Sequence, residues 1–258
     1  MDIFLPSEGD GPFPVLIHIH GGGFAMGDKR DGHVKKLLES IDKGYAFISI
    51  DYRLSDEAIF PAAVLDVRNA IRFIKEHADK YHLDKDRIAT IGGSAGGNLS
   101  AMLAMNIENG KFVGEEGKIF DFDPSIKCAI DWFGPTDFSL MDKQALENGV
   151  SFTDHSCDYS AESCYLGKRL DLVDKKIIDL ANPMSYISRK MSPIFIEHGT
   201  VDKLVPYAQS EILYEKIKKD LGSSYAEFHA LDQADHEDKM FDDDENMDLV
   251  YDFLERKL

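Results

Sequence analysis

Residues 87–103 read RIATIGGSAGGNLSAML, and this stretch decides the fold. Its first five residues form a β-rich run, and small residues that suit a packed helix begin at Ala95. The pentapeptide between them, residues 92–96, has the pattern G-x-S-x-G. Glycines at these positions permit a turn so tight that the serine stands above the end of a sheet. We therefore predict a strand, a sharp turn at Ser94 and a helix.

Short apolar runs alternate with helical patterns along the rest of the chain. Strands are predicted at 15–20, 46–51, 87–91, 126–133, 193–198 and 225–231, and helices at 31–43, 61–80, 95–109, 171–180, 207–221 and 247–258. This alternation is typical of an α/β fold with a mostly parallel central sheet and helices on both faces.

One segment, residues 134–191, interrupts the alternation because it contains no clear strand. It is too long to be a bare connection within a compact domain. We predict that the whole chain, residues 1–258, is a single domain. Residues 134–191 are then an insertion that lies, like a cap, over the edge of the sheet that carries the candidate site.

The composition limits the classes of partner. The chain has 258 residues, of which 43% are hydrophobic, as expected for a globular protein with a sizeable core. Its net charge of −18 repels nucleic acid and anionic membrane surfaces. The N-terminus has no signal-peptide pattern, and no apolar run approaches the length of a membrane span. The sequence therefore predicts a protein with neither a nucleic-acid nor a membrane partner, which is cytoplasmic, or secreted if its N-terminus has been trimmed.

Cysteines and histidines give little indication of a disulfide or a metal. Three cysteines are too few for a disulfide framework: Cys128 lies in an apolar run, whereas Cys157 and Cys164 could pair. His18 and His20 could face one side of a strand, but no third ligand at zinc spacing follows them. We predict no metal and no cofactor.

A second glycine-rich motif follows the first predicted strand, where residues 20–24 read HGGGF. Consecutive glycines let backbone N–H groups point at one spot, which is what an oxyanion hole requires. The N–H of Ala95 would lie at a helix N-terminus, where negative charge is stabilised. We predict that Gly22, Gly23 and Ala95 provide the oxyanion hole. The alternative for each motif is a glycine-rich turn without chemical function.

A serine nucleophile needs a base and an acid that orients the base, and in folds with this turn the chain order is Ser, Asp or Glu, then His. Asp202 follows the predicted strand 193–198 and His236 follows the strand 225–231. Both therefore fall at the same sheet edge as Ser94. Four residues compete for the two roles and rank lower by position: Asp137 and Asp235 as the acid, and His198 and His229 as the base.

Two further groups of residues lie near the predicted site. Four aromatic residues could line a substrate pocket or belong to the core: Phe24, Tyr52, Trp132 and Phe133. Residues 232–246 read DQADHEDKMFDDDEN, and we interpret this acidic stretch as a solvated loop.

Six stretches carry a resemblance to a known family. They are HGGGFAMGDKR (20–30), DYRLSDEAIFPAAVLDVRNAI (51–71), GGSAGGNLSA (92–101), DWFGPTDF (131–138), NPMSYIS (182–188) and HGTVDKLVP (198–206). The chain resembles α/β-hydrolases of the hormone-sensitive-lipase-like group, and more narrowly bacterial carbohydrate esterases of the acetyl xylan and feruloyl esterase type.

The resemblance implies an α/β-hydrolase fold and a serine esterase without a cofactor. Ser94, His236 and Asp202 would form its triad. Its substrates would be small-molecule or glycan-linked esters with short acyl or hydroxycinnamoyl groups. An amidase or peptidase on the same fold stays open, because pocket geometry decides which bond is cleaved. A ligand-binding protein without activity is the third alternative, although such a protein should have lost a member of the triad.

The beginning of the chain departs from the family pattern. Relatives usually have additional strands ahead of the segment that matches residues 2–6, and here those strands are missing or reduced. The sheet would then start with an exposed edge, through which a homo-oligomer could form.

Overall fold

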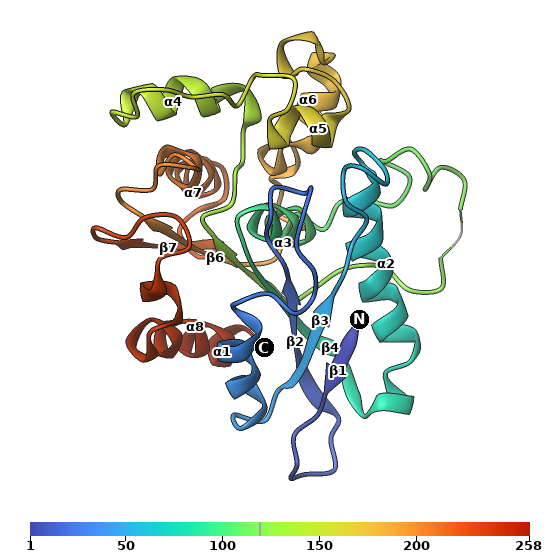
Figure 1. The fold of residues 1–258 in the computed structure, drawn as a ribbon. Helices are drawn as coiled ribbons and strands as arrows, with labels where there is room; N and C mark the ends of the chain where they lie inside the picture. The colour runs from blue at the N-terminus through green and yellow to red at the C-terminus, as the bar shows by residue number, and fades with distance from the viewer. Residues whose placement is uncertain (119) are drawn as a thin grey trace.

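The computed structural model describes residues 1–118 and 120–258 and places seven strands of those ranges in one central sheet (Figure 1). The strand order across the sheet is β1-β3-β2-β4-β5-β6-β7. The strands are β1 (Asp2–Phe4), β2 (Phe13–Ile19), β3 (Ala46–Ile50), β4 (Leu83–Gly93), β5 (Cys128–Trp132), β6 (Ile194–Gly199) and β7 (Ala226–Leu231). Every neighbouring pair is parallel except β1 and β3. The predicted mostly parallel sheet is therefore confirmed.

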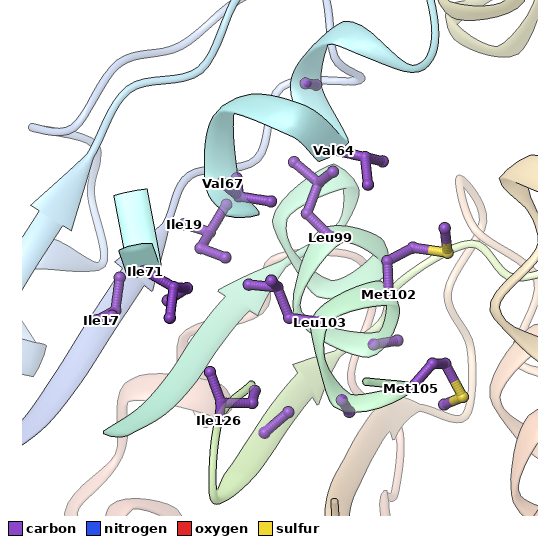
Figure 2. Close-up of a cluster of buried hydrophobic side chains, with 14 of the residues drawn as sticks. Ile17, Ile19, Val64, Val67, Ile71, Leu99, Met102, Leu103, Met105 and Ile126 are labelled. Carbon is purple, nitrogen blue, oxygen red and sulfur yellow. The ribbon is translucent and has the colours of Figure 1, made fainter. Parts of the chain in front are cut away.

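Helices cover both faces of the sheet, and each face has its own apolar core. Helices α2 (Ala62–Glu76), α3 (Ala95–Ala104) and α7 (Ala208–Leu221) pack on one face, and α1 (Val34–Leu37) and α8 (Asp244–Lys257) pack on the other. Successive side chains of a strand point to opposite faces, so Ile17 joins the first core and Leu16 the second. Figure 2 shows how apolar residues of α2 and α3 fill the first core against the sheet.

The structure differs from the predicted elements at the start of the chain. The helix predicted at 31–43 is reduced to the single turn of α1, followed by the 3₁₀ helix Leu38–Ile41. Strand β1 was not predicted, and it pairs with β3 through Asp2 opposite Ser49. Strand β1 has three residues, and within the described residues its one partner in the sheet is β3. Association of two copies through this edge stays a prediction.

The segment 134–191 contains three short α-helices, which are α4 (Met141–Glu147), α5 (Ala161–Leu166) and α6 (Lys175–Ala181). Of these, only α6 coincides with a predicted helix. Figure 1 shows all three beyond the ends at which the parallel strands finish. This placement puts the segment above the loops that follow β2, β4 and β6.

The cysteines are free thiols, so the possible pairing of Cys157 with Cys164 is not formed. Burial raises the pKa of the Cys128 thiol to about 12. Among the helices of the described ranges, none combines the length and the apolar composition that crossing a bilayer requires.

Candidate active site

Ser94 occupies the sharp turn between β4 and α3, as predicted. Its backbone has φ +55° and ψ −120°, a conformation that residues other than glycine rarely adopt. The Ser94 N–H donates to the carbonyl of Trp132 (2.9 Å), and this bond holds the turn against β5. Gly96 must be a glycine, since a Cβ there would collide with the backbone oxygen of Ile19 on β2. The close packing lets α3 begin directly at the sheet edge.

The glycine loop after β2 lies beside this turn. Gly22 and Gly23 have positive φ values of 91° and 58°, and a Cβ on Gly22 would collide with the backbone oxygen of Met26. Within the described part of the chain, no protein group accepts a hydrogen bond from the N–H of Gly22, Gly23 or Ala95. The oxyanion hole at these three N–H groups stays a prediction.

Asp202 and His236 form a hydrogen-bonded pair. The distance from His236 Nδ1 to Asp202 Oδ2 is 2.7 Å, while Asp202 Oδ1 accepts from the backbone N–H groups of Leu204 and Val205, each at 2.8 Å. Burial alone would raise the pKa of Asp202, but its hydrogen bonds with His198 and His236 outweigh burial and lower the pKa to about 2. The carboxylate is therefore ionised at neutral pH and oriented by four polar groups.

The two competing histidines hydrogen-bond to other protein groups. His198 is fully buried, with Nδ1 2.7 Å from Ser210 Oγ and Nε2 2.9 Å from the carbonyl of Val205. Its Nε2 also lies 3.2 Å from Asp202 Oδ2, so His198 contacts the same carboxylate as His236 does, from a fully buried position. His229 pairs with the buried Glu197 (3.0 Å).

The two competing acids contact other groups than the imidazole. Asp235 forms an ion pair with Lys203 (2.6 Å) and accepts the backbone N–H of His236 (2.9 Å). Asp137 begins a 3₁₀ helix by accepting from the N–H and hydroxyl of Ser139. Asp202 is thus the carboxylate among these three that holds the ring of His236.

The loop that carries His236 packs against the turn at Ser94. The edge of the Phe133 ring meets the His236 ring with 4.7 Å between centroids. A Cβ on Gly21 would lie 3.6 Å from Ser94 Cβ and 3.7 Å from Glu237 Oε1. Ser94 and the residue after His236 therefore approach the same point of the glycine loop.

A pocket of about 210 Å³ opens at Ser94. Its wall includes Gly23 and Phe24 from the glycine loop, Ala95, residues of the segment 134–191, and Leu204 with Val205. Among the four aromatic residues considered for a substrate pocket, Phe24 lines this one.

The other three aromatic residues lie in the core behind the pocket. The Tyr52 hydroxyl donates to the carbonyls of His20 (3.0 Å) and Gly21 (3.1 Å), so Tyr52 holds the glycine loop from behind. The Trp132 indole N–H donates to the buried Glu197, and Phe133 packs on His236. Their positions suit support of the site rather than contact with a ligand.

Two residues that were not predicted, His155 and Glu162, line the pocket and pair with each other at 2.8 Å. They lie in the segment 134–191, where no spacing or motif marks a functional side chain. The acidic stretch was interpreted as a solvated loop, but the structure gives it the 3₁₀ helix Lys239–Asp242 and the start of α8. Part of its charge is paired, since Asp242 contacts His33 (3.1 Å) and Asp244 contacts Lys36 (2.5 Å).

The described residues contain no group of three or more His, Cys, Asp or Glu side chains arranged to hold a metal ion. His18 Nδ1 lies 3.0 Å from Ser49 Oγ, and His20 Nδ1 lies 2.9 Å from the carbonyl of Gly21. The His20 ring stacks on Tyr52 with 4.3 Å between centroids. Both histidines therefore have protein partners.

Asp131, at the end of β5 beneath α3, is a buried acid whose burial raises its pKa to about 7. Its Oδ1 accepts from the N–H of Gly134 (2.9 Å), while Oδ2 has no partner in the described residues. In the unfolded chain, Asp131 ionises near its ordinary pKa of 3.8, so ionisation destabilises the fold increasingly as the pH rises from about 4 to 7. Asp131 thus lowers the free energy of unfolding at neutral pH.

We expect Asp131→Asn to be more stable than the wild type at pH 8. Its free energy of unfolding should be higher by at most about 4 kcal/mol, and its melting temperature should be higher too. The amide has nearly the shape of the neutral acid and, like it, carries no charge. Thermal melts of both proteins between pH 4 and pH 8 measure this. The difference between their melting temperatures should be constant above about pH 7 and become smaller below it. A difference that does not change with pH would contradict the raised pKa of Asp131.

The BD-FAE family model matches residues 1–217. This chain belongs to the BD-FAE family. The match agrees with the α/β-hydrolase resemblance carried by the glycine loop and the turn at Ser94.

Solved structures share the fold of this BD-FAE protein over nearly its whole length. A "truncated form of carbohydrate esterase from gut microbiota" has a TM-score of 0.82 and 28% identity, and covers 99% of this chain and 89% of its own. A "bifunctional GH43-CE" from Bacteroides eggerthii has a TM-score of 0.84 and 27% identity, over 99% of this chain and 35% of its own. The α/β-hydrolase fold is therefore established.

Among sequence relatives, the "probable carboxylic ester hydrolase LipM" of Mycobacterium tuberculosis is 28% identical over 210 residues, or 81% of this chain and 46% of LipM. The chain spans about half the length of the curated relatives that it matches first.

Proposed function

We propose that this protein is a serine esterase that hydrolyses short acyl esters of neutral alcohols through Ser94, His236 and Asp202. The observation that carries the proposal is the 2.7 Å hydrogen bond between His236 and Asp202, in a loop packed beside the strained turn at Ser94. A serine, an imidazole and an ionised carboxylate gathered at one sheet edge are the parts that acyl transfer needs.

In the proposed mechanism, Ser94 Oγ attacks the ester carbonyl carbon while His236 Nε2 takes the hydroxyl proton. Asp202 keeps the other imidazole proton on Nδ1 and stabilises the imidazolium. The negative charge that develops on the carbonyl oxygen is bound by the N–H groups of Gly22, Gly23 and Ala95. His236 then gives its proton to the departing alcohol, which leaves an acyl group on Ser94.

Hydrolysis of this acyl-enzyme completes the reaction. A water molecule loses a proton to His236 and attacks the acyl carbon, and the proton then returns to Ser94 as the acid leaves. Only groups of the chain and water take part, so the proposal needs no cofactor.

The pocket and the relatives support the choice of substrate. A pocket of about 210 Å³ with Phe24 in its wall suits a small acyl or alcohol group. Two of the similar solved structures, at 27% and 28% identity, are a bifunctional GH43-CE and a carbohydrate esterase, and each match covers 99% of this chain. We therefore propose esters on carbohydrate, with acetyl or hydroxycinnamoyl acyl groups, as the substrate class. The chain acts as one domain with residues 134–191 as its cap.

A panel of esters tests this function. We expect the protein to hydrolyse p-nitrophenyl acetate and butyrate faster than longer p-nitrophenyl esters, and to release acid from acetylated xylan or methyl ferulate. Faster cleavage of acetyl p-nitroanilide than of the matching ester would favour an amidase. Tight binding of these esters with no cleavage at all would favour a ligand-binding protein.

A further inference from the structure

His155 and Glu162 form a buried polar pair in the wall of the pocket that contains Ser94. The distance from His155 Nδ1 to Glu162 Oε1 is 2.8 Å, and the two side chains are 10% and 6% exposed. The proposed mechanism uses neither residue. A hydrogen-bonded His–Glu pair that lines this pocket without a part in proton transfer points to ligand recognition.

One oxygen of the pair lacks a partner. Glu162 Oε2 is buried and has no hydrogen-bond partner in the described part of the chain. A buried carboxylate oxygen without a donor is costly, and burial of polar atoms in proteins is normally compensated by a hydrogen bond. A hydroxyl group of a bound molecule would supply the missing donor.

The pair is held firmly in relation to the glycine loop. The His155 N–H donates to Asp142 Oδ1 (2.9 Å), which fixes the turn before α5. Tyr165 on α5 stacks on Phe24 with 3.9 Å between ring centroids. A Cβ on Gly23 would come within 3.1 Å of Ala161 Cβ, so the start of α5 rests directly on the loop. Glu162 therefore has a fixed position beside the ester site.

Charge adds to this geometry. Burial alone would lower the pKa of His155, but its hydrogen bond with Glu162 outweighs burial and raises the pKa. His155 Nδ1 is 2.8 Å from Glu162 Oε1, so Oε2 is the oxygen of the pair that is left to accept from a ligand.

We propose that Glu162, oriented by His155, binds a hydroxyl group on the alcohol part of the substrate and so selects esters of polyhydroxylated alcohols, such as sugars, over plain alkyl or aryl esters. The hydroxyl donates to Glu162 Oε2 while the ester carbonyl lies at Ser94. This inference rests on the proposed function, because cleavage at Ser94 fixes where the alcohol lies.

The test compares Glu162→Gln with the wild type on two acetates. One is a monoacetate of methyl β-xylopyranoside, which has free hydroxyl groups, and the other is p-nitrophenyl acetate, which has none. We expect the ratio of kcat/KM for the sugar acetate to that for p-nitrophenyl acetate to fall by about tenfold or more, since the substitution replaces one carboxylate oxygen by an amide nitrogen, which cannot accept a hydrogen bond. Glu147→Gln, at an exposed position on α4, is the matched control and should keep the wild-type ratio.

Binding gives a readout that does not depend on turnover. In NMR titrations, methyl β-xylopyranoside should bind the wild type about tenfold more tightly than Glu162→Gln. His155→Gln provides a second variant with the same expected direction if Glu162→Gln does not fold.

Each result decides between the two proposals. An unchanged kcat/KM ratio and equal sugar binding, with only a lower Tm in the variants, would overturn the hydroxyl site and leave the esterase intact. Absence of any ester cleavage by the wild type would refute the esterase, while weaker sugar binding by the variants would still support the hydroxyl site.

Discussion

Ser94→Ala is expected to lower kcat/KM for p-nitrophenyl acetate by at least about 10³-fold, because it removes the atom that forms the acyl-enzyme. The fold should persist. The substituted residue keeps a Cβ, so the backbone strain at φ +55° does not increase, and the Ser94 N–H still donates to Trp132. Steady-state kinetics and thermal melting of the two proteins measure both expectations.

Ser100→Ala is the matched control for this change. Ser100 lies on the same helix α3, is fully buried, and its hydroxyl has no partner in the described residues. Ser100→Ala removes a buried serine hydroxyl that does not line the pocket. The kcat/KM for p-nitrophenyl acetate should therefore stay within a few-fold of the wild-type value. A serine-directed phosphonate, followed by mass spectrometry, should label the wild type and Ser100→Ala at Ser94. Retention of most activity in Ser94→Ala would refute the nucleophile.

The sheet edge explains why much of the site could be predicted from the sequence. Parallel strands all finish at one edge, so a residue that directly follows such a strand lies near the others whatever its distance along the chain. Ser94 follows β4, and the loops with Asp202 and His236 follow β6 and β7. The hydrogen bond between Asp202 and His236 agrees with that reasoning.

The parts that could not be predicted depend on tertiary contacts without a local pattern. Strand β1 is too short to show periodicity, and it forms because β3 offers an open edge. The sequence leaves open whether Tyr52 and Trp132 line the pocket or belong to the core. Contacts with residues distant in the sequence decide this, such as the hydrogen bond from Trp132 to Glu197. The pairing of His155 with Glu162 likewise depends on the path of an insertion that has no regular repeat.

Asp202→Asn is expected to reduce kcat by about 10³- to 10⁴-fold while changing KM little. Asp202 Oδ1 accepts two backbone N–H groups, so the amide oxygen should keep that position and the amide nitrogen should replace Oδ2. An N–H donor facing His236 Nδ1 requires that nitrogen to be unprotonated. The imidazole proton then resides on Nε2, which can no longer accept the proton of Ser94. Ester binding in the pocket does not depend on this proton, and steady-state kinetics separate the two constants.

Asp235→Asn and Asp137→Asn test the same argument with acids that contact other groups. Asp235 is paired with Lys203, and Asp137 accepts from Ser139, so neither change alters which nitrogen of His236 carries the proton. Both variants should retain kcat within a few-fold of the wild type. The acid would be misassigned if one of them lost activity by orders of magnitude while Asp202→Asn did not. Equal losses in all three would instead indicate that the negative charge of the loop region, rather than the tautomer of His236, governs the rate.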